Sequence, residues 1–294
     1  MSTSLVTTVS PAWLLAGMGG YALTAVVAGA GEALRKPAFA RAGFWLLLAA
    51  FVFNAAMIGL MWANLDRPPF KTLYETFLLY PFCIALVSLV LVQVHRLSLL
   101  VPFAAAGALL CFYQAWRRPD LELVVLPPAL QSAWFVPHVV TYFIAYAGLF
   151  VSFVLAALSL FKARGQRGLT PISGSLEIGC LSPLARTSMP LPLEAAAHKA
   201  VMFGFAALTL GLAMGAAWGK SAWGDYWQWD PKENWAFITW LAYLSYLHLR
   251  LIGNWRGKRA LWVNLVCFAA VMFTYLGMNL LPKAVSSGSL HLYQ

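Results

Sequence analysis

Long apolar stretches, separated by short polar ones, run through the chain from near its first residue to near its last. Each stretch holds about 20 residues, the length that an α-helix needs to cross the hydrocarbon core of a bilayer. In lipid a single segment satisfies its own backbone groups only as a helix, so the pattern predicts an all-α polytopic membrane protein with about eight transmembrane helices. The stretches are 11–31, 44–63, 74–94, 98–116, 138–161, 200–218, 235–252 and 261–281.

The polar connections between these stretches differ in charge. When successive connections are assigned in turn to the two sides of the membrane, the connections on one side carry 13 Lys and Arg residues and those on the other carry 7. The positive-inside rule assigns the richer set to the cytoplasm, which predicts that both termini lie on the outer side. The richer set includes 162–199, a Gly-, Pro- and Ser-rich segment that we interpret as a cytoplasmic linker within a single integral-membrane domain spanning 1–294.

Composition narrows the class of protein. Apolar residues make up 61% of the chain and charged residues only 10%, against roughly 25% charged residues in a soluble domain. Soluble enzymes, disordered tails and coiled coils are therefore excluded. The net charge of +10 is explained by the short loops and gives no support to nucleic-acid binding. The four cysteines form no Cys-x-x-Cys pair, so neither a redox dithiol nor a zinc site is indicated.

Tryptophan is concentrated in one place. Six of the 13 tryptophans fall between Trp218 and Trp240, and the predicted topology places segment 219–235 outside, between the sixth and seventh helices. An interfacial aromatic belt is one interpretation, but a belt has one or two aromatic residues at each helix end. Four indoles and a tyrosine interleaved with Gly, Asp and Pro favour a flat-walled platform for a large planar ligand. We call the following residues the Trp platform: Trp223, Tyr226, Trp227, Trp229, Asp230 and Trp235.

Several carboxylates near the outer side have both structural and chemical interpretations. Asp230 before Pro231, with Glu233 three residues on, has the pattern of a helix N-cap with a capping box. Alternatively, Asp225, Asp230 and Glu233 bind a divalent cation. Farther upstream, Glu75 either forms an ion pair with Arg67 or Lys71 or is a first-turn carboxylate favoured by the helix dipole.

Two of the five histidines share the predicted outer side with the Trp platform. They are His138, at the start of the fifth apolar stretch, and His291, near the C-terminus. Two neutral imidazoles beside an aromatic platform are what a haem iron with two axial ligands requires, although an interfacial histidine also serves as an ordinary hydrogen-bonding group.

The other three histidines lie toward the predicted cytoplasmic side. His248 follows Trp235 by 13 residues, about 20 Å along a helix. An ionisable residue at that depth is a candidate for a second, inner haem site, or else a helix-end residue close to Arg250. His95 and His198 are interpreted as ordinary interfacial residues.

The run from Trp223 to Trp235, followed by Leu247-His-Leu-Arg250, resembles the tryptophan-rich WWD signature of the haem-handling proteins of cytochrome c maturation. Phe70-Lys-Thr-Leu-Tyr-Glu75 is similar to the Asn-Leu-Tyr-Glu-Ser box of the same superfamily, and the final Leu-His-Leu-Tyr also matches. Within that superfamily the chain resembles the System II family CcsA, also called ResC.

The resemblance implies roles for particular residues. His138 and His291 match the two external axial ligands of haem b, and the Trp platform matches the surface that holds the haem. His248 matches the transmembrane haem ligand, whose counterpart in the family comes from a CcsB-type (ResB) partner. No catalytic residue distinct from the haem ligands is implied.

The resemblance also implies an activity and a location. Haem would enter from the cytoplasmic side of a bacterial cytoplasmic (inner) membrane and be presented at the outer, periplasmic face. There it would be attached through thioethers to the Cys-x-x-Cys-His segment of apocytochrome c, with thiol-reducing proteins as further partners and lipid around the chain. The chain would be the haem-presenting subunit of a haem lyase. Rival hypotheses are a haem exporter without synthase activity, a b-type electron-transfer protein and a metal-dependent transferase.

Overall fold

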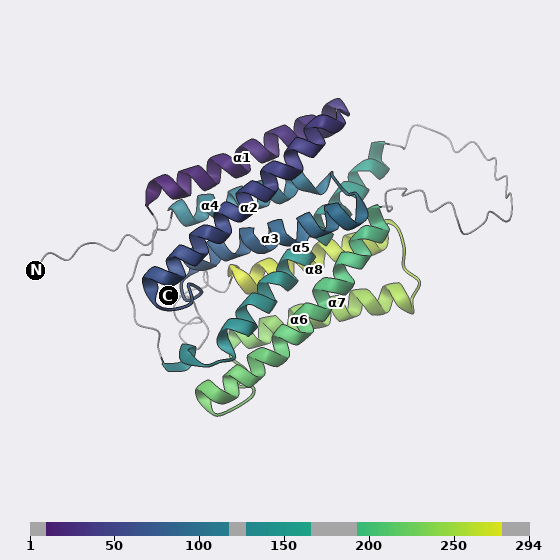
Figure 1. Cartoon of the computed structure of the whole chain (residues 1–294). Coiled ribbons are helices and arrows are strands. Elements are labelled where there is room, and N and C mark those ends of the chain that lie inside the picture. The colour runs from purple at the N-terminus through teal and green to yellow at the C-terminus, as the bar shows by residue number, and fades with distance from the viewer. Residues whose placement is uncertain (1–9, 118–127, 166–192, 278–294) are drawn as a thin grey trace, which may run out of the picture.

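The computed structural model describes residues 10–117, 128–165 and 193–277, and all regular structure in those residues is helical (Figure 1). The all-α class predicted from the apolar pattern is therefore confirmed. The elements are α1 (Pro11–Leu34), α2 (Pro37–Leu65), α3 (Leu73–His95), α4 (Leu100–Arg117), the short 3-10 helix η1 (Pro128–Gln131), α5 (Phe135–Gly165), α6 (Leu193–Trp223), α7 (Pro231–Leu251) and α8 (Lys258–Tyr275).

Helices α1 to α8 follow the eight apolar stretches in order. By length and composition, α1, α2, α3, α5 and α6 are suited to crossing a membrane. These helices agree with a multi-pass membrane protein. The number of crossings and the side on which each terminus lies stay predictions, and both termini lie outside the described residues.

Helix boundaries follow local chemistry. Pro11, Pro37 and Pro231 occupy first-turn positions, where a missing N–H costs nothing. Thr72 caps α3 and Asp230 caps α7, each within a capping box.

Helices α5 and α6 extend into segments that were predicted to be linkers. Helix α5 continues to Gly165 and α6 begins at Leu193, so both ends of the predicted linker 162–199 are helical, and 166–192 lies outside the described residues. Helix α6 also runs to Trp223, because 216–223 contains no proline and its single glycine, Gly219, costs the helix only about 1 kcal/mol. The irregular part of the segment predicted to be external is therefore 224–230, shorter than the predicted 219–235.

Helices α3, α5 and α8 form the centre of the bundle. In Figure 1, α1 and α2 lie along one side and α6 and α7 along the other, with α3 and α5 between them. Aromatic side chains join the central helices: the ring of Tyr275 lies 5.7 Å from that of Tyr80 and 5.4 Å from that of Phe143. The Tyr275 hydroxyl also contacts Thr76 Oγ1 at 3.2 Å. Phe143 and Tyr275 of this aromatic centre also line the cavity described below.

Candidate functional site

A cavity of about 300 Å³ opens where α5 begins and α6 ends. Its wall is predominantly aromatic, as expected of a site for a large apolar ligand. Helices α3, α5, α6, α7 and α8 all bring residues to it, either directly or through the segments beside them. The aromatic lining comprises Phe70, Phe135, Tyr142, Phe143, Tyr146, Trp218, Trp223, Tyr226, Trp227 and Tyr275. Among the polar lining residues are Lys71, His138, Lys232, Glu233 and Thr274.

His138 is fixed in this wall by its neighbours. Its Nδ1 lies 2.8 Å from the carbonyl oxygen of Gly211, and because a carbonyl only accepts, Nδ1 carries the proton and donates it. In a neutral ring Nε2 is then the basic nitrogen, the arrangement typical of a metal-ligating histidine oriented through its other nitrogen. The ring stacks against Trp218, with centroids 5.6 Å apart, and meets Tyr142 edge-on at 4.8 Å.

Gly215 provides the space that this ring occupies. A Cβ atom built on Gly215 would lie 2.6 Å from Cε1 of His138, well inside van der Waals contact. Gly211 and Gly215 are four residues apart on α6, the small-residue spacing that lets membrane helices approach closely. The position of the imidazole therefore depends on two glycines of the neighbouring helix.

The turn between α6 and α7 is held by the side chains that follow it. Glu233 accepts hydrogen bonds from the backbone N–H groups of Gln228 at 2.8 Å and Asp230 at 3.3 Å. Asn234 Nδ2 donates to the carbonyl of Trp229 at 2.9 Å. These bonds compensate an unusual backbone, because Trp229 has a φ of 57°, in the left-handed region that bulky residues avoid.

The structure divides the Trp platform into two groups. Trp223, Tyr226 and Trp227 line the cavity with His138. Trp229 is 69% exposed and meets Trp227 edge-on at 6.1 Å, outside the cavity wall. Trp235 instead packs against Phe273, with centroids 4.2 Å apart.

Asp230 has the capping role that its sequence context indicates. It is buried, and its side chain accepts from the backbone N–H of Lys232 at 2.7 Å. With Glu233 it forms the capping box of α7. In the part of the chain that the structure describes, no group of three or more His, Cys, Asp or Glu side chains is arranged to hold a metal ion. Two carboxylates of the alternative cation site, Asp230 and Glu233, therefore stabilise the turn, and the third, Asp225, is exposed.

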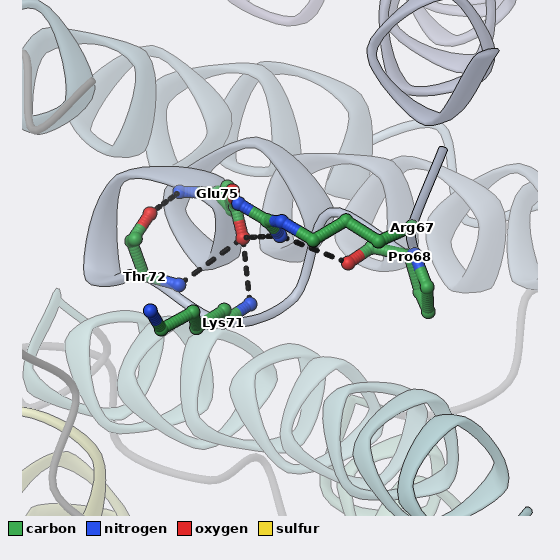
Figure 2. A network of polar contacts seen from close by, with 5 residues as sticks. All are labelled: Arg67, Pro68, Lys71, Thr72 and Glu75. Atoms are coloured by element: carbon green, nitrogen blue, oxygen red, sulfur yellow. Dashed lines mark hydrogen bonds and ion pairs between the residues drawn. The ribbon is translucent and has the colours of Figure 1, made fainter. Parts of the chain in front are cut away.

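A second capping box stabilises the segment before α3 (Figure 2). Arg67 and Glu75 form a buried ion pair, with Nη2 2.7 Å from Oε1. Oε2 of Glu75 also accepts from the backbone N–H groups of Lys71 at 2.6 Å and Thr72 at 3.1 Å. The predicted pairing of Glu75 with Arg67 is thus confirmed, together with its first-turn position. The network fixes the segment that places Phe70 and Lys71 in the cavity wall.

The remaining predicted histidines lie elsewhere. His248 is exposed near the C-terminal end of α7. His198 is partly buried near the start of α6, where its ring lies 6.0 Å from that of Tyr246, and His95 ends α3. His291 lies outside the described residues. The structure therefore brings one predicted ligand, His138, together with part of the Trp platform.

Three features of the site fit a haem. The cavity has large flat aromatic walls, and His138 presents the tautomer that an axial ligand needs. The indole N–H of Trp227 is buried, and no described residue accepts its hydrogen bond. Because an unsatisfied buried donor costs about 1–3 kcal/mol, an occupant with acceptor oxygens would stabilise this wall.

Sequence reasoning missed several site residues. Trp218 stacks on His138 and donates from Nε1 to the carbonyl of Ala129 at 2.8 Å. Its position at the edge of the tryptophan cluster was the available signal. For Gly211 and Gly215 the signal was their four-residue spacing. Nothing in the sequence joins Lys71 to Lys232, because their shared place in one cavity wall depends on the packing of α3 against α5, of α5 against α8 and of α7 against α8.

Comparisons with known proteins support a common family. Residues 70–286 match the family described as "Cytochrome C assembly protein". A "Cytochrome c biogenesis protein CcsA" of Synechococcus sp. (strain CC9902) is 32% identical over 261 residues, covering 82% of this chain and 84% of that protein. The protein of the same name from Chlorella vulgaris is 32% identical over 251 residues, covering 78% and 79%.

A solved structure has a similar fold. The protein called "Cytochrome c Heme Lyase CcmF" superposes with a TM-score of 0.67 at 17% identity. The match covers 98% of this chain and 52% of that one, so this chain spans about half the length of the larger protein. At this identity the likeness concerns the fold alone.

Proposed function

This chain belongs to the CcsA family of cytochrome c biogenesis proteins, and from that premise we propose that it presents haem b for attachment to apocytochrome c. Presentation takes place at the outer, periplasmic face of a bacterial cytoplasmic membrane. The chain is the haem-presenting subunit of a holocytochrome c synthase. The observation that carries the proposal is the position of His138, oriented by Gly211 in an aromatic cavity that Trp223 and Trp227 also line.

Different residues of the cavity would bind different parts of the haem. His138 Nε2 would hold the iron from this wall, and His291 would supply a second ligand by analogy with the family. Trp223, Tyr226 and Trp227 would lie against the porphyrin, where flat aromatic faces bury a large apolar area. Trp229, exposed beside them, extends this surface toward the apocytochrome.

The substrate supplies the reactive groups. Each cysteine thiol of the Cys-x-x-Cys-His segment adds across one haem vinyl group, so that sulfur bonds to one vinyl carbon and the thiol hydrogen is transferred to the other. No group leaves and no net oxidation occurs. The contribution of the protein is therefore orientation, which raises the effective concentration of thiol and vinyl, and control of the iron through imidazole ligation.

His248 belongs to a second, inner haem site in this proposal. It is exposed on α7 rather than directed into the bundle, which suits a haem shared with another membrane chain. A CcsB-type partner supplies the opposing ligand. Thiol-reducing proteins keep the apocytochrome cysteines in the form that reacts.

The test is product formation. The chain is co-expressed with its CcsB-type partner and an apocytochrome, and covalent haem is measured by mass spectrometry of the cytochrome. We expect thioether product with the wild type and a loss of product in His138→Ala. Haem bound at the cavity without any thioether product would contradict the synthase proposal and favour an exporter.

A further inference from the structure

Two lysines from distant parts of the sequence line the aromatic cavity. Lys71 comes from the segment before α3, and Lys232 from the first turn of α7. A third lysine of this region, Lys220, differs from them. It is exposed at the end of α6, where its ammonium group lies 5.5 Å from the Tyr226 ring centroid and donates to the carbonyl of Gly224. Lys220 does not line the cavity.

Each cavity lysine stands beside a capping box that fixes its backbone. The backbone N–H of Lys71 donates to Oε2 of Glu75 at 2.6 Å, within the network shown in Figure 2. The backbone N–H of Lys232 donates to Oδ1 of Asp230 at 2.7 Å. Two separate helix starts therefore hold one cation each at the same cavity.

The carboxylates near these lysines each stabilise a helix start, and Asp230 also interacts electrostatically with Lys232. Glu75 is paired with Arg67. Glu233 accepts from two backbone N–H groups of the 224–230 turn, and Asp230 caps α7. These acids stabilise the two helix starts, while the lysines add positive charge to a wall that is otherwise mainly aromatic.

The cavity environment favours an anionic occupant. Lys232 lies ahead of the apolar stretch that begins at 235, and burial lowers its pKa to about 8. An anion beside Lys232 would stabilise its charged form.

We propose that Lys71 and Lys232 bind the two carboxylates on one edge of a planar porphyrin and thereby set the orientation in which it enters the cavity. Aromatic walls suit the apolar ring, and cations on two different helix starts suit two carboxylates side by side. Binding at this edge leaves the opposite, vinyl-bearing edge of the ring directed away from the two lysines. This inference rests on the proposed haem-presenting function.

The test compares two ligands that differ only in these carboxylates. The purified full-length chain is titrated with iron protoporphyrin IX and with its dimethyl ester, and binding is followed by the Soret absorbance. The variants are Lys71→Met, Lys232→Met and the corresponding Arg substitutions, with Lys220→Met as the matched control.

We expect the wild type to bind the free acid at least about tenfold more tightly than the diester, since a charge-assisted hydrogen bond contributes that much or more. Each Met variant should lose about tenfold in affinity for the free acid and keep its affinity for the diester. The Arg variants should restore the preference, and Lys220→Met should not change it. Diester binding also reports that each variant is folded.

Three results would overturn the inference. The first is a wild type that binds acid and diester equally, which would leave the proposed function intact. The second is equal loss for both ligands in the Met variants, or displacement of the haem by millimolar inorganic phosphate. The third is a folded wild type that binds neither ligand, which would overturn the proposed function as well.

Discussion

His138 illustrates how much a single residue depends on its surroundings. The sequence places it at the start of a helix, but its orientation comes from α6, through the Gly211 carbonyl and the space above Gly215. Trp218 and Tyr142 restrict the ring further. A histidine held on several sides loses little freedom on binding a metal, which favours ligation.

Gly215→Ala should weaken haem binding by about 10- to 100-fold, the range found when a group that orients a metal ligand is changed. The new methyl group would overlap Cε1 of His138 and turn the ring away from the cavity. Haem titration of the purified chain measures the effect. Gly59→Ala is the control, because a Cβ at Gly59 meets nothing within 4 Å. Equal affinity in the two variants would contradict the role of Gly215.

The affinity for iron protoporphyrin IX should fall as the pH rises through about 8. Below that pH Lys232 carries its proton, and above it the ammonium charge that attracts the ligand carboxylates is lost. Asp230 opposes the shift by favouring the charged lysine. Titrations from pH 6.5 to 9.5 in wild type and Lys232→Met give the comparison. An equally steep decline in both proteins would show that another group is responsible.

At the scale of elements, α3 and α7 begin in the same way, and the start of each helix contributes residues to the same cavity wall. Both start with a capping box, and in both the carboxylate at the third helical position returns to the preceding turn. The Asp230-Pro-Lys-Glu233 pattern was predictable because capping is local. The separation of Trp235 from the cavity was not predictable, since it follows from the packing of α7 against α8, where Trp235 meets Phe273.

Asp230→Asn should retain haem binding, whereas Asp230→Ala should lower both haem occupancy and stability. Asparagine caps a helix about as well as aspartate, while alanine costs about 1 kcal/mol. Haem content and thermal unfolding in detergent test the pair. If Asp230 were instead a cation ligand, asparagine would impair the protein nearly as much as alanine.

Arg67→Met should destabilise the protein by about 3–5 kcal/mol, because it leaves the Glu75 carboxylate buried without its cation. The displaced segment should also carry Phe70 and Lys71 away from the cavity. Thermal unfolding in detergent measures the stability. The double variant Arg67→Met, Glu75→Gln should recover part of the loss, and no recovery would argue against the ion pair as the cause.

For the whole molecule, eight apolar stretches were enough to predict an all-α bundle, because each element is apolar and long. The pairing of the elements was beyond the sequence alone. Helix α3 packs against α2, α4 and α5, and α5 packs against α6 and α8, so the cavity takes residues from opposite ends of the chain. Apolar periodicity says which segments are helices, whereas shape complementarity between them decides which become neighbours.

The most direct test of the account is the reduced-minus-oxidised visible spectrum of the full chain purified with its CcsB-type partner. Wild type is compared with the double variant His138→Ala, His291→Ala. We predict a bis-imidazole haem signal in the wild type that falls in the variant, because the external site would lose both axial ligands. A wild-type signal that persists unchanged in the variant would contradict the external site and assign the haem to His248. No haem in either folded sample would contradict the haem-handling account as a whole.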